Sequence, residues 1–297
     1  MSLYPWHQAA FDQISGADFQ SLLLVAPPGQ GVAGFARALT ARVMCAQGTA
    51  CGTCQSCQWL AQDAHPDVHS MIPEGKAHAH KIEAVRRIIE LSGTTTHQGG
   101  RRVIQIFEAE RMNIAGANGL LKVLEEPPAG THFILSSTLP GRLPPTILSR
   151  CRLYRLPSAP QDMSWLDALC APSAQRDQAI QLTQAPDELL ELLATPELLQ
   201  ARFAWRQALL SSLQGQTVLQ SLVDAAAPLP VMVWLDDWYR LCVEQGKAAI
   251  DDAERLSRLA KFQARLQKER QPVLEQVTLN PTLMLRALGS LWLRVAA

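Results

Sequence analysis

The sequence predicts an α/β part with a parallel sheet, followed by a part built only of helices. Short apolar runs of strand length alternate with segments of helical periodicity over residues 1–157. The first run, at residues 21–26, is continuously apolar, as in a strand that is buried on both faces. Beyond the proline-rich segment 157–160 no strand pattern returns, and helical segments follow one another. Such an order predicts a parallel sheet covered by helices on both faces, with a helical second half.

The expected elements follow from periodicity and from the residues that interrupt it. Strands are expected at residues 21–26, 68–72, 103–107, 133–136 and 153–156, with helices at 32–44, 82–91 and 115–124. Past residue 160 we expect helices at 189–193, 198–213, 231–243, 253–266 and 283–293. Proline lacks the backbone N–H and clashes with the preceding turn, so it marks helix ends. Breaks are therefore expected at Pro186, Pro196, Pro228, Pro230, Pro272 and Pro281.

Composition restricts the class of protein. The chain has 297 residues, 47% of them hydrophobic, which is enough to build cores and argues against disorder. Its 27 basic and 27 acidic side chains balance, whereas a free-standing DNA-binding protein carries surplus Lys and Arg. The N-terminus has no secretory pattern, and no apolar window approaches the ~20 residues that span a bilayer. We therefore expect a cytoplasmic protein without membrane contact.

A phosphate-binding loop is expected where the first strand turns into the first long helix. The active motif is G-x-x-x-x-G-K-[ST], whose loop amides and lysine hold phosphates. Residues 26–33 read A-P-P-G-Q-G-V-A, so Gly29 and Gly31 keep the loop shape. Val32 replaces the lysine, and Ala33 replaces the hydroxyl that holds Mg²⁺. Taken alone, the segment fits an ordinary glycine turn equally well.

A second position supports the loss of a nucleotide site. ATPases with such a loop place a Mg²⁺-holding carboxylate at the end of another strand, followed by a Glu that aligns water. Here the strand at 103–107 ends in Phe107, and only Glu108 remains of that pair. Polar groups are thus missing from two separate positions, while the loop shape is kept. The pattern predicts a chain that does not require ATP.

Four cysteines lie within thirteen residues, at Cys45, Cys51, Cys54 and Cys57. In a reducing compartment such a cluster indicates metal binding and not a disulfide framework. Four thiolates around one ion form the closed tetrahedral site of structural Zn²⁺, with no position left for water. His65 is a competing ligand, and burial of free cysteines is the alternative. Local stability and a partner contact both remain open as the purpose of this zinc module.

Two longer segments resemble a known family. Residues 118–128 read N-G-L-L-K-V-L-E-E-P-P, and residues 146–151 read T-I-L-S-R-C. Both look like motifs of the clamp-loader family of AAA+ ATPases, the subunits that serve bacterial DNA polymerase III. Tyr4-Pro5-Trp6, the cysteine cluster and His65-Pro66-Asp67 also fit. The resemblance is dense over residues 4–157, and it is greatest to a member that lacks the loop lysine and keeps S-R-C.

This resemblance implies a domain organisation and a set of partners. It implies an AAA+ P-loop-type α/β domain at 1–157 with the zinc module at 45–57, a small helical lid at 158–200 and an all-helical collar domain at 201–297. It implies a non-hydrolysing, stator-like subunit of a hetero-pentamer with ATP-binding gamma/tau-type and delta-type subunits. That complex, part of the DNA polymerase III holoenzyme, loads the sliding clamp onto primed DNA.

One residue carries the expected chemistry. By resemblance, Arg150 is an arginine finger that reaches the γ-phosphate of ATP bound by a neighbouring subunit, where a guanidinium stabilises the transferring phosphoryl. Outside its motif, Arg150 would be taken for a solvated surface residue. Ser137 and Thr138 stand at the family's sensor position, where a strand-end hydrogen bond is the better interpretation. The alternative functions are a weakly active AAA+ ATPase and a zinc-containing nucleic-acid-binding protein.

Overall fold

The computed structural model describes residues 3–16, 19–74, 79–97, 100–274 and 280–296. The chain divides into two compact units, and one short segment returns to the first of them. The first unit comprises residues 1–168 and 185–187, and the second comprises residues 169–184 and 188–297. Within the described ranges, every helix is too short or too polar to cross a membrane.

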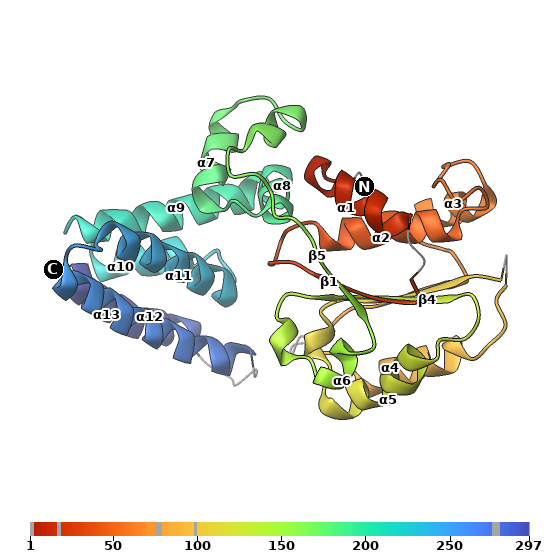
Figure 1. Ribbon diagram of the computed structural model, residues 1–297. Helices are drawn as coiled ribbons and strands as arrows, with labels where there is room; N and C mark the ends of the chain where they lie inside the picture. Colours follow the sequence, from red (N-terminus) through yellow and green to blue (C-terminus); the bar gives the residue numbers. More distant parts are fainter. Residues whose placement is uncertain (1–2, 17–18, 75–78, 98–99, 275–279, 297) are drawn as a thin grey trace. The chain divides into compact units, whose positions relative to one another are not determined.

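The first unit is built on a five-stranded parallel sheet with the strand order β2-β3-β4-β1-β5 (Figure 1). The central strand β1 pairs with β4 on one side and with β5 on the other, and all of its residues are buried. Each expected strand is present, with ends that differ by at most two residues. The strands are β1 (Ser21–Val25), β2 (Val68–Met71), β3 (Arg102–Ile106), β4 (Thr131–Ser137) and β5 (Arg152–Arg155).

Helices cover both faces of this sheet (Figure 1). Since successive side chains of a strand point to opposite faces, β1 supplies Leu22 and Leu24 to one core and Leu23 and Val25 to the other. One face carries α1 (Gln8–Ser15), α2 (Val32–Met44) and α3 (Gln55–Ala61), and the other carries α4 (Ile82–Ser92), α5 (Ile114–Glu125) and α6 (Pro145–Leu148). Short 3₁₀ turns are η1 (Pro5–His7), η2 (Ala109–Arg111), η3 (Pro140–Arg142) and η4 (Ser164–Ala168).

The parallel strands bring three connections to one edge of the sheet. Their carboxyl ends meet there, and in open α/β sheets this is where ligands bind. The loop from β1 to α2, the turn from β3 to η2 and the end of β4 all lie at this edge. The sheet therefore places the glycine loop, the Phe107-Glu108 pair and the sensor position next to one another.

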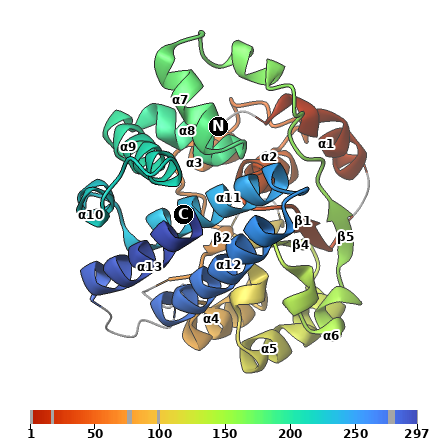
Figure 2. The ribbon, with the colours of Figure 1, turned by 90° about the vertical axis from the view of Figure 1, so that its left-hand side faces the viewer.

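The second unit is helical throughout its described residues. Figures 1 and 2 show α12 lying beside α11 and α13. Its core is formed around four tryptophans, of which Trp238 contacts Trp205 and Trp292 edge-on, with ring centroids 5.2 and 5.8 Å apart. The helices are α7 (Ala174–Leu182), α8 (Pro186–Ala194), α9 (Pro196–Leu213), α10 (Leu219–Ala226), α11 (Val231–Ala248), α12 (Ala253–Leu274) and α13 (Pro281–Ala296). The first two residues of α8 belong to the first unit.

One expected helix break was wrong, and five helices were not expected: α1, α3, α6, α7 and α10. Pro272 does not end α12, which continues to Leu274. A proline so close to a helix end leaves few backbone hydrogen bonds beyond it to lose. The helix α7 was not expected from its polar sequence. The Ser173 side chain caps it by accepting the N–H of Arg176 at 3.2 Å, and Ala179 and Leu182 are buried.

Candidate functional site

The glycine loop has the backbone geometry that its sequence predicts. Gly29 and Gly31 have φ angles of 72° and 78°, in the left-handed region that favours glycine. Helix α2 begins directly after the loop, at Val32. A Cβ added at Gly31 would lie 2.4 Å from two ring carbons of Tyr4, so this position also requires glycine for space. The loop is therefore shaped by its own glycines and by the N-terminal segment packed on it.

A carboxylate from a distant part of the chain binds this loop. Asp187 accepts the backbone N–H of Gly31 at 2.9 Å through Oδ2, and its own N–H donates to the carbonyl of Gly29 at 3.0 Å. The Tyr4 hydroxyl donates to Asp187 Oδ1 at 2.8 Å. Both carboxylate oxygens are thus hydrogen-bonded within the first unit. The N–H of Gly31, the residue that caps the N-terminus of α2, is thereby paired with an anion.

The ring of Tyr4 closes the loop from the N-terminal side. It stacks on Trp6 at a centroid distance of 4.5 Å, and Trp165 packs edge-on against Trp6 at 5.0 Å. Burial and the neighbouring Asp187 both raise the pKa of Tyr4, so its hydroxyl stays protonated and keeps donating. Aromatic packing and one hydrogen bond together hold Asp187 against the loop.

The first residue after β3 is Phe107, so no carboxylate stands at the position that would hold Mg²⁺. Phe107 packs against the core under α2. The Glu108 carboxylate lies 3.3 Å from Arg111 Nε, and the residue has a φ of 49°. A non-glycine residue in this region is uncommon and is found where surrounding contacts hold it. The backbone N–H of Glu108 donates to the Ser136 hydroxyl at 3.1 Å.

The polar groups at the end of β4 form a local network. Glu110 Oε1 accepts the backbone N–H of Thr138 at 2.9 Å and its hydroxyl at 2.8 Å. The Ser137 hydroxyl accepts the N–H of Leu139 at 3.2 Å. Burial opposes ionisation of Glu110, but these hydrogen bonds outweigh it and the pKa of Glu110 is lowered. The hydroxyl of Thr138 serves a strand-end hydrogen bond.

The glycine loop, the end of β3 and the end of β4 all contribute residues to one cavity of about 1060 Å³ in the first unit. Arg150 is not among its described lining residues. The cavity extends from the glycine loop along α2 toward the cysteine segment. Sequence positions that were singled out separately are thus brought together at this edge of the sheet: Gly29, Val32, Ala33, Phe107 and Thr138. Asp187, which the sequence did not point to, lines the same cavity.

Arg150 lies at the surface after α6. Its Nη2 and Nε lie 2.7 and 2.8 Å from Glu125 Oε2, at the end of α5. Its Nη1 donates to the carbonyl oxygen of Thr146 at 3.1 Å. The Arg150 side chain is 27% exposed and that of Glu125 is 58% exposed, so the pair is in contact with water. The two family-like segments noted in the sequence therefore meet through a charge pair.

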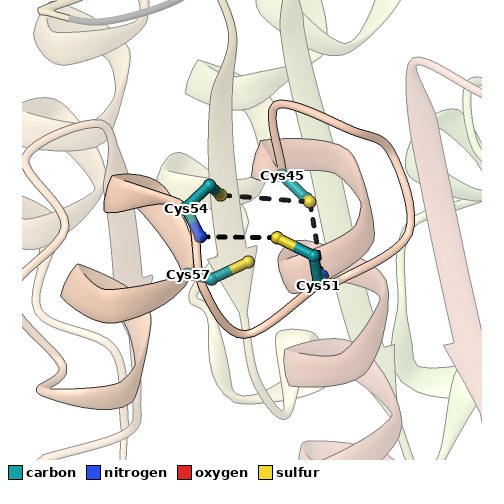
Figure 3. A group of neighbouring side chains, drawn as sticks. All are labelled: Cys45, Cys51, Cys54 and Cys57. Atoms are coloured by element: carbon teal, nitrogen blue, oxygen red, sulfur yellow. Dashed lines mark hydrogen bonds between the residues drawn. The ribbon is translucent and has the colours of Figure 1, made fainter.

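The four cysteines converge on one point. Cys45 follows α2, Cys51 lies in the connecting loop, and Cys54 and Cys57 stand at the start of α3, with their sulfurs turned toward one another (Figure 3). The four Sγ atoms all lie within 4.8 Å of one another, and those of Cys45 and Cys54 are 4.0 Å apart.

This geometry fits a tetrahedral metal ion. Zn–S bonds of ~2.3 Å place the sulfurs of a tetrahedral site about 3.8 Å apart. Backbone N–H groups point at the sulfurs: Cys51 donates to Cys45 Sγ and Cys54 to Cys51 Sγ, each at 3.4 Å. The first of these is the main cause that lowers the pKa of Cys45 to about 5, whereas burial raises that of Cys57 to about 12. A coordinated ion would deprotonate all four.

His65 stays outside the cysteine group. Its Nδ1 accepts the backbone N–H of Asp67 at 3.1 Å, and its ring packs edge-on against Trp59. The Asp67 carboxylate accepts the N–H of His97 at 2.9 Å and lies 3.7 Å from Arg102, with both side chains buried. The His65-Pro66-Asp67 segment is thus engaged in structural contacts.

Sequence reasoning missed Asp187, Glu110 and the partner of Arg150. Asp187 follows a proline at the start of a helix, where an acidic residue is common for local reasons. Its 156-residue separation from Gly31 carries no sequence pattern. Tyr4 was noted only as part of a motif, and Glu125 only as part of another.

Comparison with known proteins finds relatives of this chain. Residues 11–160 match the family described as DNA polymerase III, delta subunit. The chain is 30% identical to DNA polymerase III subunit delta' of Pseudomonas aeruginosa, over 98% of this chain and 97% of that protein. It is 35% identical to subunit delta' of Escherichia coli K12, over 56% of this chain and about half (53%) of that protein.

The fold has a counterpart among solved structures. A DNA polymerase III gamma subunit-related protein from Thermotoga maritima superposes with a TM-score of 0.53 at 16% identity, covering 98% of this chain and 99% of that one. The predicted AAA+-type α/β part followed by a helical part is thereby confirmed. With a family match over half its length and relatives at 30% identity and above, the chain belongs to the delta-prime subunit family of bacterial DNA polymerase III.

Proposed function

We propose that this chain is a non-hydrolysing, stator-like subunit of a DNA polymerase III clamp loader. In this function it supplies Arg150 in trans to the ATP of a neighbouring subunit, and the complex loads the sliding clamp onto primed DNA. The partners are ATP-binding gamma/tau-type subunits and a delta-type subunit in a hetero-pentamer. Membership of the delta-prime family supports the partners, and the contacts of the glycine loop support the absence of hydrolysis.

The carboxylate of Asp187 is the observation that carries the non-hydrolysing part. Loop N–H groups are what a P-loop offers to a phosphate. Here the Gly31 N–H donates to Asp187 at 2.9 Å. An anionic phosphate placed at the same N–H would meet a fixed negative charge instead of the lysine that Val32 replaces. Ala33 and Phe107 supply no ligand for Mg²⁺, so neither ATP nor Mg²⁺ is required by this subunit.

The surface position of Arg150 supports action on a neighbour. The residue does not line the cavity at its own glycine loop within the described part of the chain. Its guanidinium is held after α6, and its side chain is partly exposed to solvent. An arginine that acts in trans must be presented at the surface, and it is worth ~10³-fold or more in rate in related phosphoryl transfers.

The cysteine group is best assigned to structural Zn²⁺. Four sulfurs within 4.8 Å of one another suit the closed tetrahedral site. Such a site contributes to folding of the local segment because ligands and fold form together. We further propose that residues 158–200 act as a lid and residues 201–297 as a collar that joins the subunits, with the α/β domain at 1–157.

The two alternatives each lack a supporting contact. A weakly active ATPase needs a free loop, and its first binding step would have to displace Asp187. A zinc-containing nucleic-acid binder needs a basic surface, whereas this chain is neutral overall. The polymerase reaction itself is assigned to other components of the holoenzyme.

The decisive experiment is the ATPase rate of a reconstituted clamp loader, stimulated by primed DNA and the sliding clamp. It compares the wild-type chain with Arg150→Ala, with Arg152→Ala as a matched control two residues away on β5. We expect Arg150→Ala to lower the rate by ~10²-fold or more without preventing assembly. The chain alone should show no turnover. Turnover by the chain alone, or an unchanged rate with Arg150→Ala, would refute the proposal.

A further inference from the structure

The N-G-L-L-K-V-L-E-E-P-P segment carries two glutamates, Glu125 and Glu126, before its prolines. Its first glutamate, Glu125, is the last residue of α5, since the prolines at 127 and 128 stop the helix. The structure brings this carboxylate to Arg150, 25 residues later in the chain. The proposed arginine finger is therefore not a lone surface side chain.

The guanidinium of Arg150 is fixed from two sides. Glu125 Oε2 accepts from both Nε and Nη2, at 2.8 and 2.7 Å. On the other side, Nη1 donates to the Thr146 carbonyl at 3.1 Å and lies 3.5 Å from the Ser149 hydroxyl. The guanidinium has five N–H groups in a rigid plane, so these contacts define its orientation and leave N–H capacity on Nη2.

Both charged residues are adjacent to core residues. Leu124 precedes Glu125, and Cys151 follows Arg150, and both are buried in the same hydrophobic cluster beneath the sheet. Ile147 of α6 belongs to that cluster as well. The backbones that carry the two charges are thus held by packing, and the charge pair has little to contribute to the fold. An exposed ion pair of this kind adds little to stability.

We propose that Glu125 is a positioning residue, which aligns the guanidinium of Arg150 for the ATP of the neighbouring subunit. This inference rests on the proposed function. A side chain with as many rotatable bonds as arginine loses rotational freedom when it reaches a transition state. Glu125 removes part of that freedom beforehand, so the aligned guanidinium meets the phosphoryl group without a further search. Misplacement of a catalytic group by ~1 Å costs up to ~10²-fold in rate.

Glu126 offers a matched control. It is the next residue, has the same charge and is exposed, but in the described part of the chain it forms no ion pair with Arg150. Glu125→Gln keeps the shape and removes the charge, Glu125→Ala removes both, and Glu126→Gln removes a charge without touching the pair. Each variant is incorporated into the reconstituted clamp loader, and its stimulated ATPase is measured over a range of ATP concentrations.

We expect Glu125→Ala to lower kcat by about tenfold at an unchanged KM for ATP, Glu125→Gln to lower it less, and Glu126→Gln to have no effect. In an Arg150→Ala background, Glu125→Ala should cause no further loss, because the two residues act as one unit. A merely structural role would give additive losses. If Arg150→Ala lowers the rate while Glu125→Ala leaves it unchanged or raises it, the positioning role is overturned. If Arg150→Ala has no effect, the proposed function fails, and this inference with it.

Discussion

The Asp187 carboxylate accepts the backbone N–H of Gly31 at 2.9 Å, across 156 residues of sequence. The same residue returns a hydrogen bond from its own N–H to Gly29 at 3.0 Å, so the contact has two points of attachment. Charge-assisted hydrogen bonds of this kind are among the stronger ones in proteins.

Restoring the lysine should restore nucleotide binding only when Asp187 is also removed. In Val32→Lys the new ammonium would pair with the Asp187 carboxylate, which still occupies the Gly31 N–H. In the double variant Val32→Lys with Asp187→Ala, the new ammonium and the Gly31 N–H both become available to phosphate. We expect the double variant to bind a fluorescent ATP analogue with Mg²⁺ at least ~10-fold more tightly than Val32→Lys alone. Glu191→Ala, an exposed change on the same helix α8, is the control and should not affect binding.

Two glycines of the same region should respond to alanine in opposite ways. Gly31→Ala forces a side chain into a left-handed conformation and against the Tyr4 ring, 2.4 Å away. It should lower the free energy of unfolding by about 1–3 kcal/mol. Gly34→Ala lies in α2 with open space around the added Cβ. It should raise that free energy by ~0.5–1 kcal/mol, because alanine favours the helix. Urea unfolding measures both, and equal effects would contradict the loop geometry.

Removal of one ligand should release the metal. Cys54→Ser leaves three thiolates, so the chain should lose most of its zinc on gel filtration and melt at a lower temperature. The wild-type chain should retain one zinc ion. Cys170→Ser removes a cysteine outside the group and should change neither metal content nor melting. Metal analysis and thermal melts decide; retention of zinc by Cys54→Ser would show that the ligand set is different.

The second unit contains a buried charge cluster. Arg202, on α9, donates to Asp237 at 2.9 Å through Nε, and its Nη2 lies 2.9 Å from Glu188. Arg202→Met leaves two acidic groups without this partner and should destabilise the chain by about 3–5 kcal/mol. Arg206→Met, one turn along α9, breaks only a partly exposed pair with Glu244 and should cost less than ~1 kcal/mol. Similar losses for the two variants would argue against the buried cluster.

One carboxyl of this cluster, that of Glu188, predicts acid sensitivity. Burial opposes ionisation of Glu188, but hydrogen bonds from Arg240 and Thr183 outweigh it and lower the pKa of Glu188. A carboxyl that is more acidic in the folded chain stabilises it fully above the unfolded-state pKa of ~4.3, and this contribution is lost as pH falls through the folded-state pKa. Glu188→Gln should thus cost ~1–3 kcal/mol at pH 7 and progressively less below pH ~4. Glu191→Gln should show no such trend in urea titrations across this range.

Local patterns predicted the fold well. The run at residues 21–26 is apolar on both faces because the side chains of β1 are buried in two cores, one on each face of the sheet. Such burial can be recognised directly from the continuous apolar run. Helix α2 begins at Val32, where the loop glycine ends. The four cysteines could be grouped from the sequence because all four lie within one short segment. The α7 helix was not predicted because its stability comes from a cap and from tertiary burial, and not from an apolar stripe.

The two contacts on which the proposals rest, Asp187 with Gly31 and Glu125 with Arg150, join segments that are distant in the sequence. Nothing in the residues around Asp187 indicates that it binds Gly31, since Pro-Asp-Glu is an ordinary helix start. Glu125 and Arg150 each stood in a family-like segment, but only the packing of α5 against α6 brings them together. Sequence patterns report short-range geometry and burial, whereas a charge pair between a partly exposed arginine and an exposed glutamate leaves no periodicity to detect.

The Asp187 contact also gives the glycine loop a ligand that cannot diffuse away. A group on the same chain acts at an effective concentration on the order of millimolar or more, which does not vary with conditions outside the molecule. A free nucleotide would have to displace the Asp187 carboxylate, whose effective concentration at the loop is constant. Under the proposed function, the loop of this subunit therefore responds only weakly to the ATP level of the cell, and a change in ATP would act on the complex mainly through the neighbouring subunits.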